Sequence, residues 1–230
     1  MKEPTRFGGT AAILLGLSYV ALAAAHLFLP PAQQGGSASA GFFRSFAADP
    51  LPSMLQYTVA ALGAVLGLAV VPAISGIVRA RSTDLVRWAS ALAYLGFAAV
   101  LFDSVRFLTY QPARAALFAA GDATVQTTVL VSDPLLYLDA QGWFGFGGVG
   151  LWVAIISFLA WREGRFGHPL ACLGMAVAAA YWIVVAGFVT TNELLFTAAA
   201  VAGSVVGPIW FVWLGLRLLS QPRHVPLEAA

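Results

Sequence analysis

Long uncharged runs of mostly apolar residues alternate with short polar segments along the chain, and this pattern predicts the secondary structure. A helix needs roughly 20 apolar residues to cross a hydrocarbon core of about 30 Å, whereas strands of a membrane barrel alternate apolar and polar residues over about ten positions. Six runs have the helical length: 8–29, 53–78, 88–110, 142–161, 170–189 and 194–216. We therefore expect an all-α fold, a polytopic six-helix transmembrane bundle formed as one domain over residues 1–230.

The composition places the chain outside the soluble classes of protein. Hydrophobic residues occupy 60% of the 230 positions and charged residues only 10%, whereas a soluble domain carries roughly 25% charged residues. So few charges cannot cover a soluble protein of this size, which excludes a soluble enzyme and a disordered chain. The net charge of +2 supplies no electrostatic field for a nucleic-acid partner. The single cysteine, Cys172, excludes an intramolecular disulfide and a multi-cysteine metal site.

The cations predict the orientation of the bundle. If the amino terminus is cytoplasmic, nine of the 12 cations fall on the inner side, as the positive-inside rule requires. These nine are Lys2, Arg6, Arg79, Arg81, Arg87, Arg162, Arg165, Arg217 and Arg223. The prediction is a multi-pass protein of the inner membrane with both termini in the cytoplasm.

Two longer connections, 30–52 and 111–141, fall on the extracytoplasmic side of this topology. We expect them to pack into a cap over the outer end of the bundle. In the first connection, Phe42, Phe43 and Phe46 are expected to lie at the membrane interface, as aromatic residues of amphipathic segments do. In the second, residues 113–120 predict a short helix of their own, and the pair Asp133-Pro134 predicts the end of helical structure before the fourth span.

Asp103 and Arg106 are the only charged residues within the predicted spans. Ionisable groups inside a membrane are costly and point to a functional site by default. Their i, i+3 spacing places both side chains on one helix face, where they can largely neutralise each other. Both fall in the outer half of the third span, and two interpretations stay open: a structural ion pair, or a site for a ligand or a proton.

Other polar residues fall on the same predicted side of the membrane: His26, Arg44, Asn192 and Glu193. In a closed bundle they would surround Asp103 and Arg106 beneath the cap and form a ligand-binding site. Individually, His26 is also explained as a hydrogen-bonded histidine at a helix end, and Glu193 as a solvated turn acid. Haem held by two axial histidines is not expected, because His168 and His224 fall on the cytoplasmic side of this topology and His26 does not. The sequence has no intramembrane lysine for retinal and none of the motifs of metalloproteases, nucleotide-binding loops or serine hydrolases. No catalytic or metal site is predicted, and the cofactor is unknown.

Small and aromatic residues recur through the second half of the chain: Gly145, Gly148, Leu151, Trp152, Pro169, Leu173, Gly174, Tyr181, Gly187, Trp213, Leu214 and Arg217. With these residues the stretch 142–219 resembles a bacterial integral-membrane family known as domain of unknown function 4386 (DUF4386). The resemblance implies the six-span layout and carries no established activity. Members often have an acidic residue early in the last helix and a histidine before the fourth, where this chain has Ser204 and Asp139.

The expected function follows from a polar cluster without catalytic spacing. The leading hypothesis is a membrane protein without its own catalytic centre, acting as an accessory, scaffold or small-ligand-binding subunit. Its partners would be the lipid bilayer and a second copy or other membrane subunits, with no nucleic acid. One alternative is a secondary transporter or channel that uses Asp103 as its coupling carboxylate. Another is a membrane enzyme acting on a lipid, in which Asp103 and either Glu193 or His26 supply the acid and base.

Overall fold

The fold is that of a computed structural model, which describes residues 4–34, 39–78 and 83–220. Four of the predicted inner cations lie outside these ranges: Lys2, Arg79, Arg81 and Arg223. Of the residues in these ranges, 88% are helical and none belongs to a strand. In chain order the elements are α1 (Pro4–Leu27), α2 (Pro31–Gln34), α3 (Ala40–Ala48), α4 (Leu51–Val78), α5 (Thr83–Ala120), α6 (Ala123–Ser132), the 3-10 helix η1 (Pro134–Leu136), the π-helix η2 (Trp143–Gly148), α7 (Val149–Arg162), α8 (His168–Val189) and α9 (Glu193–Leu219).

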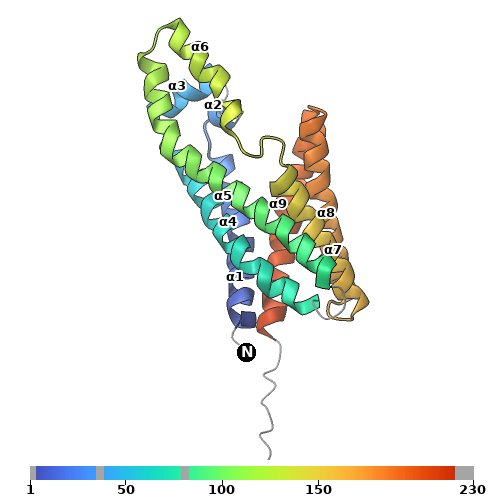
Figure 1. Ribbon diagram of the computed structural model, residues 1–230. Coiled ribbons are helices and arrows are strands. Elements are labelled where there is room, and N and C mark those ends of the chain that lie inside the picture. Colours follow the sequence, from blue (N-terminus) through green and yellow to red (C-terminus); the bar gives the residue numbers. More distant parts are fainter. Residues whose placement is uncertain (1–3, 35–38, 79–82, 221–230) are drawn as a thin grey trace, which may run out of the picture.

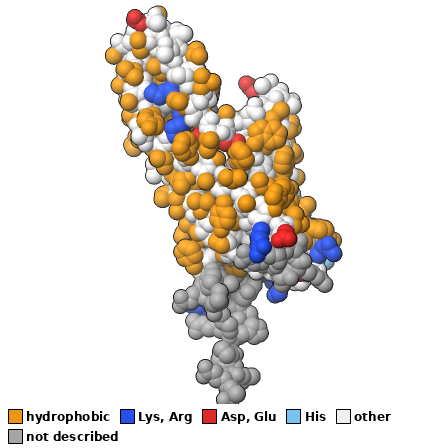
Figure 2. Space-filling view, in the orientation of Figure 1, with side chains coloured by type: hydrophobic (Ala, Val, Ile, Leu, Met, Phe, Trp, Pro, Cys, Tyr) orange, Lys and Arg blue, Asp and Glu red, His pale blue; other side chains and the backbone are white. Residues whose placement is uncertain are grey.

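Six helices of the described ranges are long and apolar enough to cross a membrane: α1, α4, α5, η2 continued by α7, α8 and α9. The predicted six-helix transmembrane bundle is thereby confirmed as the fold class. Apolar side chains cover the visible flank of the bundle (Figure 2), and large ones such as Leu62, Leu95 and Val205 are more than half exposed. An apolar surface of this extent is unfavourable in water, so this flank suits the hydrocarbon of a bilayer.

The spanning helices form a closed ring in which each packs on its neighbours in the order α1, α4, α5, α7, α8, α9 and back to α1. The described beginning of α1 and the described end of α9 therefore lie side by side at one end of the bundle (Figure 1). We name this the basic end, because the turn between α7 and α8 with Arg162 and Arg165 also lies there. The opposite end, which carries α3 and α6, is the cap end.

Glycines allow α1 and α9 to approach closely. A Cβ atom on Gly215 would lie 2.6 Å from the Gly9 carbonyl oxygen, and one on Gly16 would lie 2.9 Å from the Pro208 carbonyl oxygen. Both distances are too short for a real Cβ, so only glycine fits. Helices in lipid gain no hydrophobic driving force from packing on each other. Dispersion between closely packed backbones stabilises their contact instead.

A few hydroxyl and indole groups connect α4, α5 and α7 inside the bundle. The Ser75 and Ser90 hydroxyl oxygens are 2.7 Å apart, and the Trp152 indole N–H donates to Ser75 Oγ at 3.1 Å. Trp152 also meets Trp210 of α9 edge to face, with ring centroids 6.5 Å apart. Hydrogen bonds of this kind between helices fix their register in a core that is otherwise apolar.

The helix α5 is much longer than the predicted span 88–110. At a rise of about 1.5 Å per residue, its 38 residues extend over roughly 57 Å, nearly twice the thickness of a hydrocarbon core. The expected separate helix at 113–120 is therefore wrong: these residues continue α5, with Pro112 inside it. The pair Asp133-Pro134 does end a helix, because α6 stops at Ser132.

The extension of α5 carries a small second core, here named the cap, which consists of α2, α3, α6 and the last four turns of α5. Its centre is aromatic. Phe43 stacks on Phe118 with centroids 5.1 Å apart, and Phe46 meets Phe107 edge to face at 5.8 Å. Phe42, Phe43 and Phe46 are all buried in this core, so the expectation that they face the membrane interface is wrong.

A buried glutamine joins the first half of the cap to the bundle. Gln33 of α2 donates its Nε2 to Ser45 Oγ at 3.1 Å and to the Asp49 carbonyl oxygen at 3.0 Å, and its Oε1 accepts from Ser53 Oγ at 2.7 Å. The cap follows α4 and α5 and does not cover the whole bundle end as expected. In Figure 1 the outer ends of α8 and α9 stand apart from it, and Figure 2 shows the surface hollowed between the two.

The close approach of α1 and α9 predicts the effect of one added methyl group. We expect Gly215→Ala to lower the free energy of unfolding by about 1–3 kcal/mol, because the new Cβ forces the two backbones apart. The control is Gly76→Ala, since nothing lies within 4 Å of a Cβ at that exposed helical position. Both variants are measured by denaturant titration of the purified protein in mild detergent. Equal stabilities for the two variants would contradict the packing argument.

Candidate functional site

One face of the outer half of α5 carries four polar side chains: Asp103, Arg106, Gln111 and Arg114. The steps of three, five and three residues keep them on one side of a helix with 3.6 residues per turn. That side faces the cap and the segment that returns to the bundle. Burial is nearly complete, with exposed fractions of 6% for Arg106 and 1% for Gln111. We name these residues, together with Asp133 and Tyr137, the polar cluster.

The pair that the sequence singles out does form. Arg106 Nε lies 3.8 Å from Asp103 Oδ1. Asp103 Oδ1 also accepts from the Leu138 backbone N–H at 3.0 Å, and its Oδ2 accepts from the Asp139 N–H at 3.4 Å. The carboxylate therefore holds the connection between η1 and η2 against α5 as well as balancing the charge of Arg106.

Asp139 continues this chain of contacts into the fourth span. Its Oδ2 accepts from the backbone N–H groups of Phe144 and Gly145 at 3.0 and 2.7 Å. These are free donors at the start of η2, where a carboxylate is favourable because it satisfies them and opposes the positive end of the helix dipole. In addition, a Cβ on Gly96 of α5 would collide with the Phe144 carbonyl oxygen. Gly96 thus allows the start of η2 to pack closely on α5.

A second ion pair, which the sequence analysis did not single out, closes the cap. Arg114 Nη2 lies 3.2 Å from Asp133 Oδ1 and donates to the Val129 carbonyl oxygen at 2.6 Å. The Asp133 side chain is only 1% exposed. The two residues are 19 positions apart and no periodicity connects them. Only the placement of Asp133 at the end of α6, beside a proline, gave a signal in the sequence.

Tyrosines from two elements complete the polar cluster around Arg106. The Arg106 guanidinium carbon lies 4.1 Å above the Tyr137 ring, a cation–π contact. Tyr57 of α4 hydrogen-bonds to Tyr137 through the side chains and stacks on Phe107, with centroids 3.6 Å apart. Arg106 is therefore enclosed by α4, α5 and the segment after η1.

Several polar side-chain atoms of the polar cluster are buried without a hydrogen-bond partner among the described residues. They are the three guanidinium nitrogens of Arg106, the amide nitrogen and oxygen of Gln111, and Nε and Nη1 of Arg114. Leaving a buried polar group without a partner costs about 1–3 kcal/mol. Cationic N–H groups and an amide are the groups that proteins use to bind carboxylates, phosphates and carbonyl oxygens. The polar cluster therefore contains the kinds of group that bind acceptor-rich ligands in other proteins.

The other predicted site residues do not join this cluster. His26 is exposed on α1, where its Nδ1 lies 3.5 Å from Gln56 Nε2. Arg44 is exposed on α3. Asn192 caps α9 by accepting from the Leu195 N–H at 3.0 Å, and Glu193 is exposed in the first turn of that helix. Of the six predicted site residues, only Asp103 and Arg106 belong to the polar cluster. The other members of the cluster are Gln111, Arg114, Asp133 and Tyr137.

The search for metal ligands and the comparisons with known proteins add no assignment. Within the described ranges, no three His, Cys, Asp or Glu residues lie close enough together to hold a metal ion. No protein family, curated protein or solved structure matches the chain. The class of protein that the fold defines is a helical polytopic membrane protein with a buried, charged cluster beside its cap.

The buried pair Arg114–Asp133 and the exposed pair Arg87–Asp84 allow a direct test of how much the polar cluster contributes to stability. We expect Arg114→Met to lower the free energy of unfolding by about 3–5 kcal/mol, because it leaves Asp133 charged and buried. The double variant Arg114→Met/Asp133→Leu should recover part of that loss. The matched control is Arg87→Met, since the Arg87–Asp84 pair at 3.5 Å has side chains 64% and 97% exposed and is worth less than about 1 kcal/mol. Denaturant titration in detergent measures all three, and a double variant no more stable than Arg114→Met would contradict the pairing.

Proposed function

We propose that this chain is a multi-pass protein of the inner membrane without its own catalytic centre, which acts as a small-ligand-binding accessory subunit. The observation that carries the proposal is the set of buried N–H groups on Arg106, Gln111 and Arg114 that make no hydrogen bond among the described residues. Acidic and basic side chains are visible where the surface is hollowed between the cap and the ends of α8 and α9 (Figure 2). The side chain of Asp103 is 15% exposed, so the polar cluster reaches the surface of the protein at this carboxylate.

The arrangement of Asp103 favours this proposal over a coupling carboxylate in a transporter. A coupling group has to change its protonation state and its partners during each cycle. Both oxygens of Asp103 instead hold backbone N–H groups, and one also pairs with Arg106. A catalytic pair of Asp103 with His26 or Glu193 receives no support either, since both are exposed on other helices.

The distribution of described cations supports the predicted orientation. Arg6, Arg87, Arg162, Arg165 and Arg217 belong to the basic end, whereas the cap end has Arg44 and the paired Arg106 and Arg114. By the positive-inside rule the basic end is cytoplasmic and the cap is extracytoplasmic. Expected partners are the bilayer and, laterally, a second copy or other membrane subunits. Membership of the DUF4386 family is part of the same proposal and would add architecture only.

Binding is tested with small acceptor-rich probes: acetate, pyruvate and succinate. We expect at least one probe to raise the melting temperature of the purified protein saturably, because it satisfies the buried donors. Arg106→Met and Gln111→Leu should remove that shift. Glu193→Gln is the control, since Glu193 lies outside the polar cluster, and it should keep the shift. No shift with any probe, or an unchanged shift in Arg106→Met, would refute the proposed site.

Orientation is tested by labelling single cysteines in a Cys172→Ser background with a membrane-impermeant maleimide. We expect Glu193→Cys at the cap end to be labelled in intact cells whose outer membrane is permeabilised. Arg165→Cys at the basic end should be labelled only after lysis. Both positions are exposed, so accessibility to water is matched. The reverse pattern would place the cap in the cytoplasm.

A further inference from the structure

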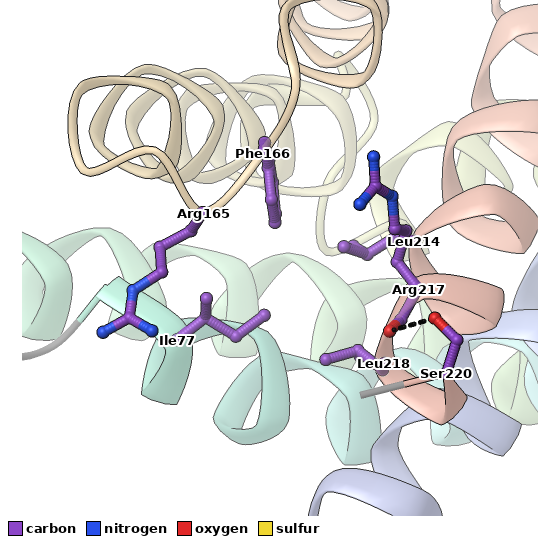
Figure 3. A pocket seen from close by; sticks show the side chains of 7 residues that line it. All are labelled: Ile77, Arg165, Phe166, Leu214, Arg217, Leu218 and Ser220. Carbon is purple, nitrogen blue, oxygen red and sulfur yellow. Dashed lines mark hydrogen bonds between the residues drawn. The ribbon is translucent and has the colours of Figure 1, made fainter. Parts of the chain in front are cut away.

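A cavity of about 180 Å³ lies at the basic end, on the side opposite to the polar cluster (Figure 3). It is formed where the last turns of α4 and α9 meet the turn between α7 and α8. Its lining consists of Ile77, Arg165, Phe166, Leu214, Arg217, Leu218 and Ser220. The volume exceeds by far the roughly 10–15 Å³ that a single water needs, so the cavity can hold a molecular group.

Two arginines supply the charge of this cavity. Figure 3 shows Arg165 and Arg217 on either side of the Phe166 ring, one from the turn and one from α9. Neither guanidinium makes an ion pair within the described part of the chain, in contrast to Arg87, which pairs with Asp84. Arg162, nearby in sequence, lies over the Phe158 ring at 5.6 Å. The one acid of the turn, Glu163, forms no ion pair there either, so both cavity arginines keep their charge available for an anion.

The rest of the lining is apolar. Phe166, Leu214 and Leu218 are buried, with exposed fractions of 5% or less. A free inorganic ion gains nothing from such a floor, whereas the glycerol and upper acyl chain of a lipid gain contact area. Leu216 of α9 and Trp161 of α7, close in sequence to lining residues, are about half exposed apolar side chains. The cavity lies at the ends of the spanning helices α4 and α9, the level at which lipid headgroups are expected.

We propose that this cavity binds the phosphate headgroup of an anionic phospholipid, with Arg165 and Arg217 contacting the phosphate and the apolar floor receiving the glycerol end. Basic pockets between helix ends on the cytoplasmic side are suited to acidic headgroups, because the local charge adds to close hydrogen bonding. The site is separate from the polar cluster of the cap, and its test does not depend on the ligand proposed there. An occupied cavity would hold α4, α9 and the turn before α8 together.

The experiment compares lipids added to the purified full-length chain in neutral detergent, with the melting temperature as readout. We expect dioleoyl phosphatidylglycerol to stabilise the protein saturably, and dioleoyl phosphatidylcholine and inorganic phosphate to have no such effect. The double variant Arg165→Gln/Arg217→Gln should need roughly tenfold more phosphatidylglycerol for half of the shift, because two cations near an anionic headgroup are lost.

The control is Arg87→Gln/Arg162→Gln, which removes the same charge from the same end but outside the cavity, and it should respond as the wild type does. Arg165→Lys/Arg217→Lys keeps the charge and should retain most of the response, which guards against a variant that fails to fold. An equal response in the cavity variant and the control variant would overturn the proposal. So would stabilisation by phosphatidylcholine to the same extent. A full shift with inorganic phosphate alone that Arg165→Gln/Arg217→Gln loses would overturn it too, because it would indicate a free-anion site in the cavity.

Discussion

The structure depends on a mismatch between the length of α5 and the thickness of a membrane. A hydrocarbon core of about 30 Å accommodates roughly 20 helical residues, and α5 has 38. The surplus projects beyond the bundle and needs a new set of partners, because an isolated helix of that length is only marginally stable in water. The cap supplies them: the rings of α3 cover Phe107 and Phe118, and α6 folds back along the end of α5 (Figure 1).

The charged side chains of the described residues are either paired in the interior or at least partly exposed to solvent. In the half of α5 nearer the cap, two arginines each have one aspartate partner. Asp103 lies on α5 itself and holds the backbone of the segment before η2, whereas Asp133 follows α6 and ties its end to α5. The two pairs add no net charge, so four ionisable side chains are accommodated here without a large electrostatic penalty. Their cost is the desolvation of the groups that remain without hydrogen bonds. That cost is why the polar cluster, and not the exposed His26 or Glu193, carries the functional proposal.

The two ends of the bundle are built differently, and their proposed roles follow from this. At the basic end, α1 and α9 approach through Gly9 and Gly215, and arginines surround short turns and a small cavity (Figure 3). At the cap end, α8 and α9 stand apart from the cap, and Arg106, Arg114 and Asp133 are turned inward. A solute at the cap end and a lipid headgroup at the basic end would thus meet arginines in two unrelated settings.

The sequence by itself determined the helical membrane class and the number of spans, because burial in lipid permits only long apolar runs with internally bonded backbones. It also determined the Asp103–Arg106 pair, which a spacing of three residues places on one helix face. The tertiary structure decided the rest. Nothing local indicates that α5 continues through Pro112, that Arg114 meets Asp133 across 19 residues, or that Asn192 and Glu193 lie away from Asp103. These depend on which helices are neighbours, and helix order in a ring is set by close packing between distant segments, which leaves no period in the sequence.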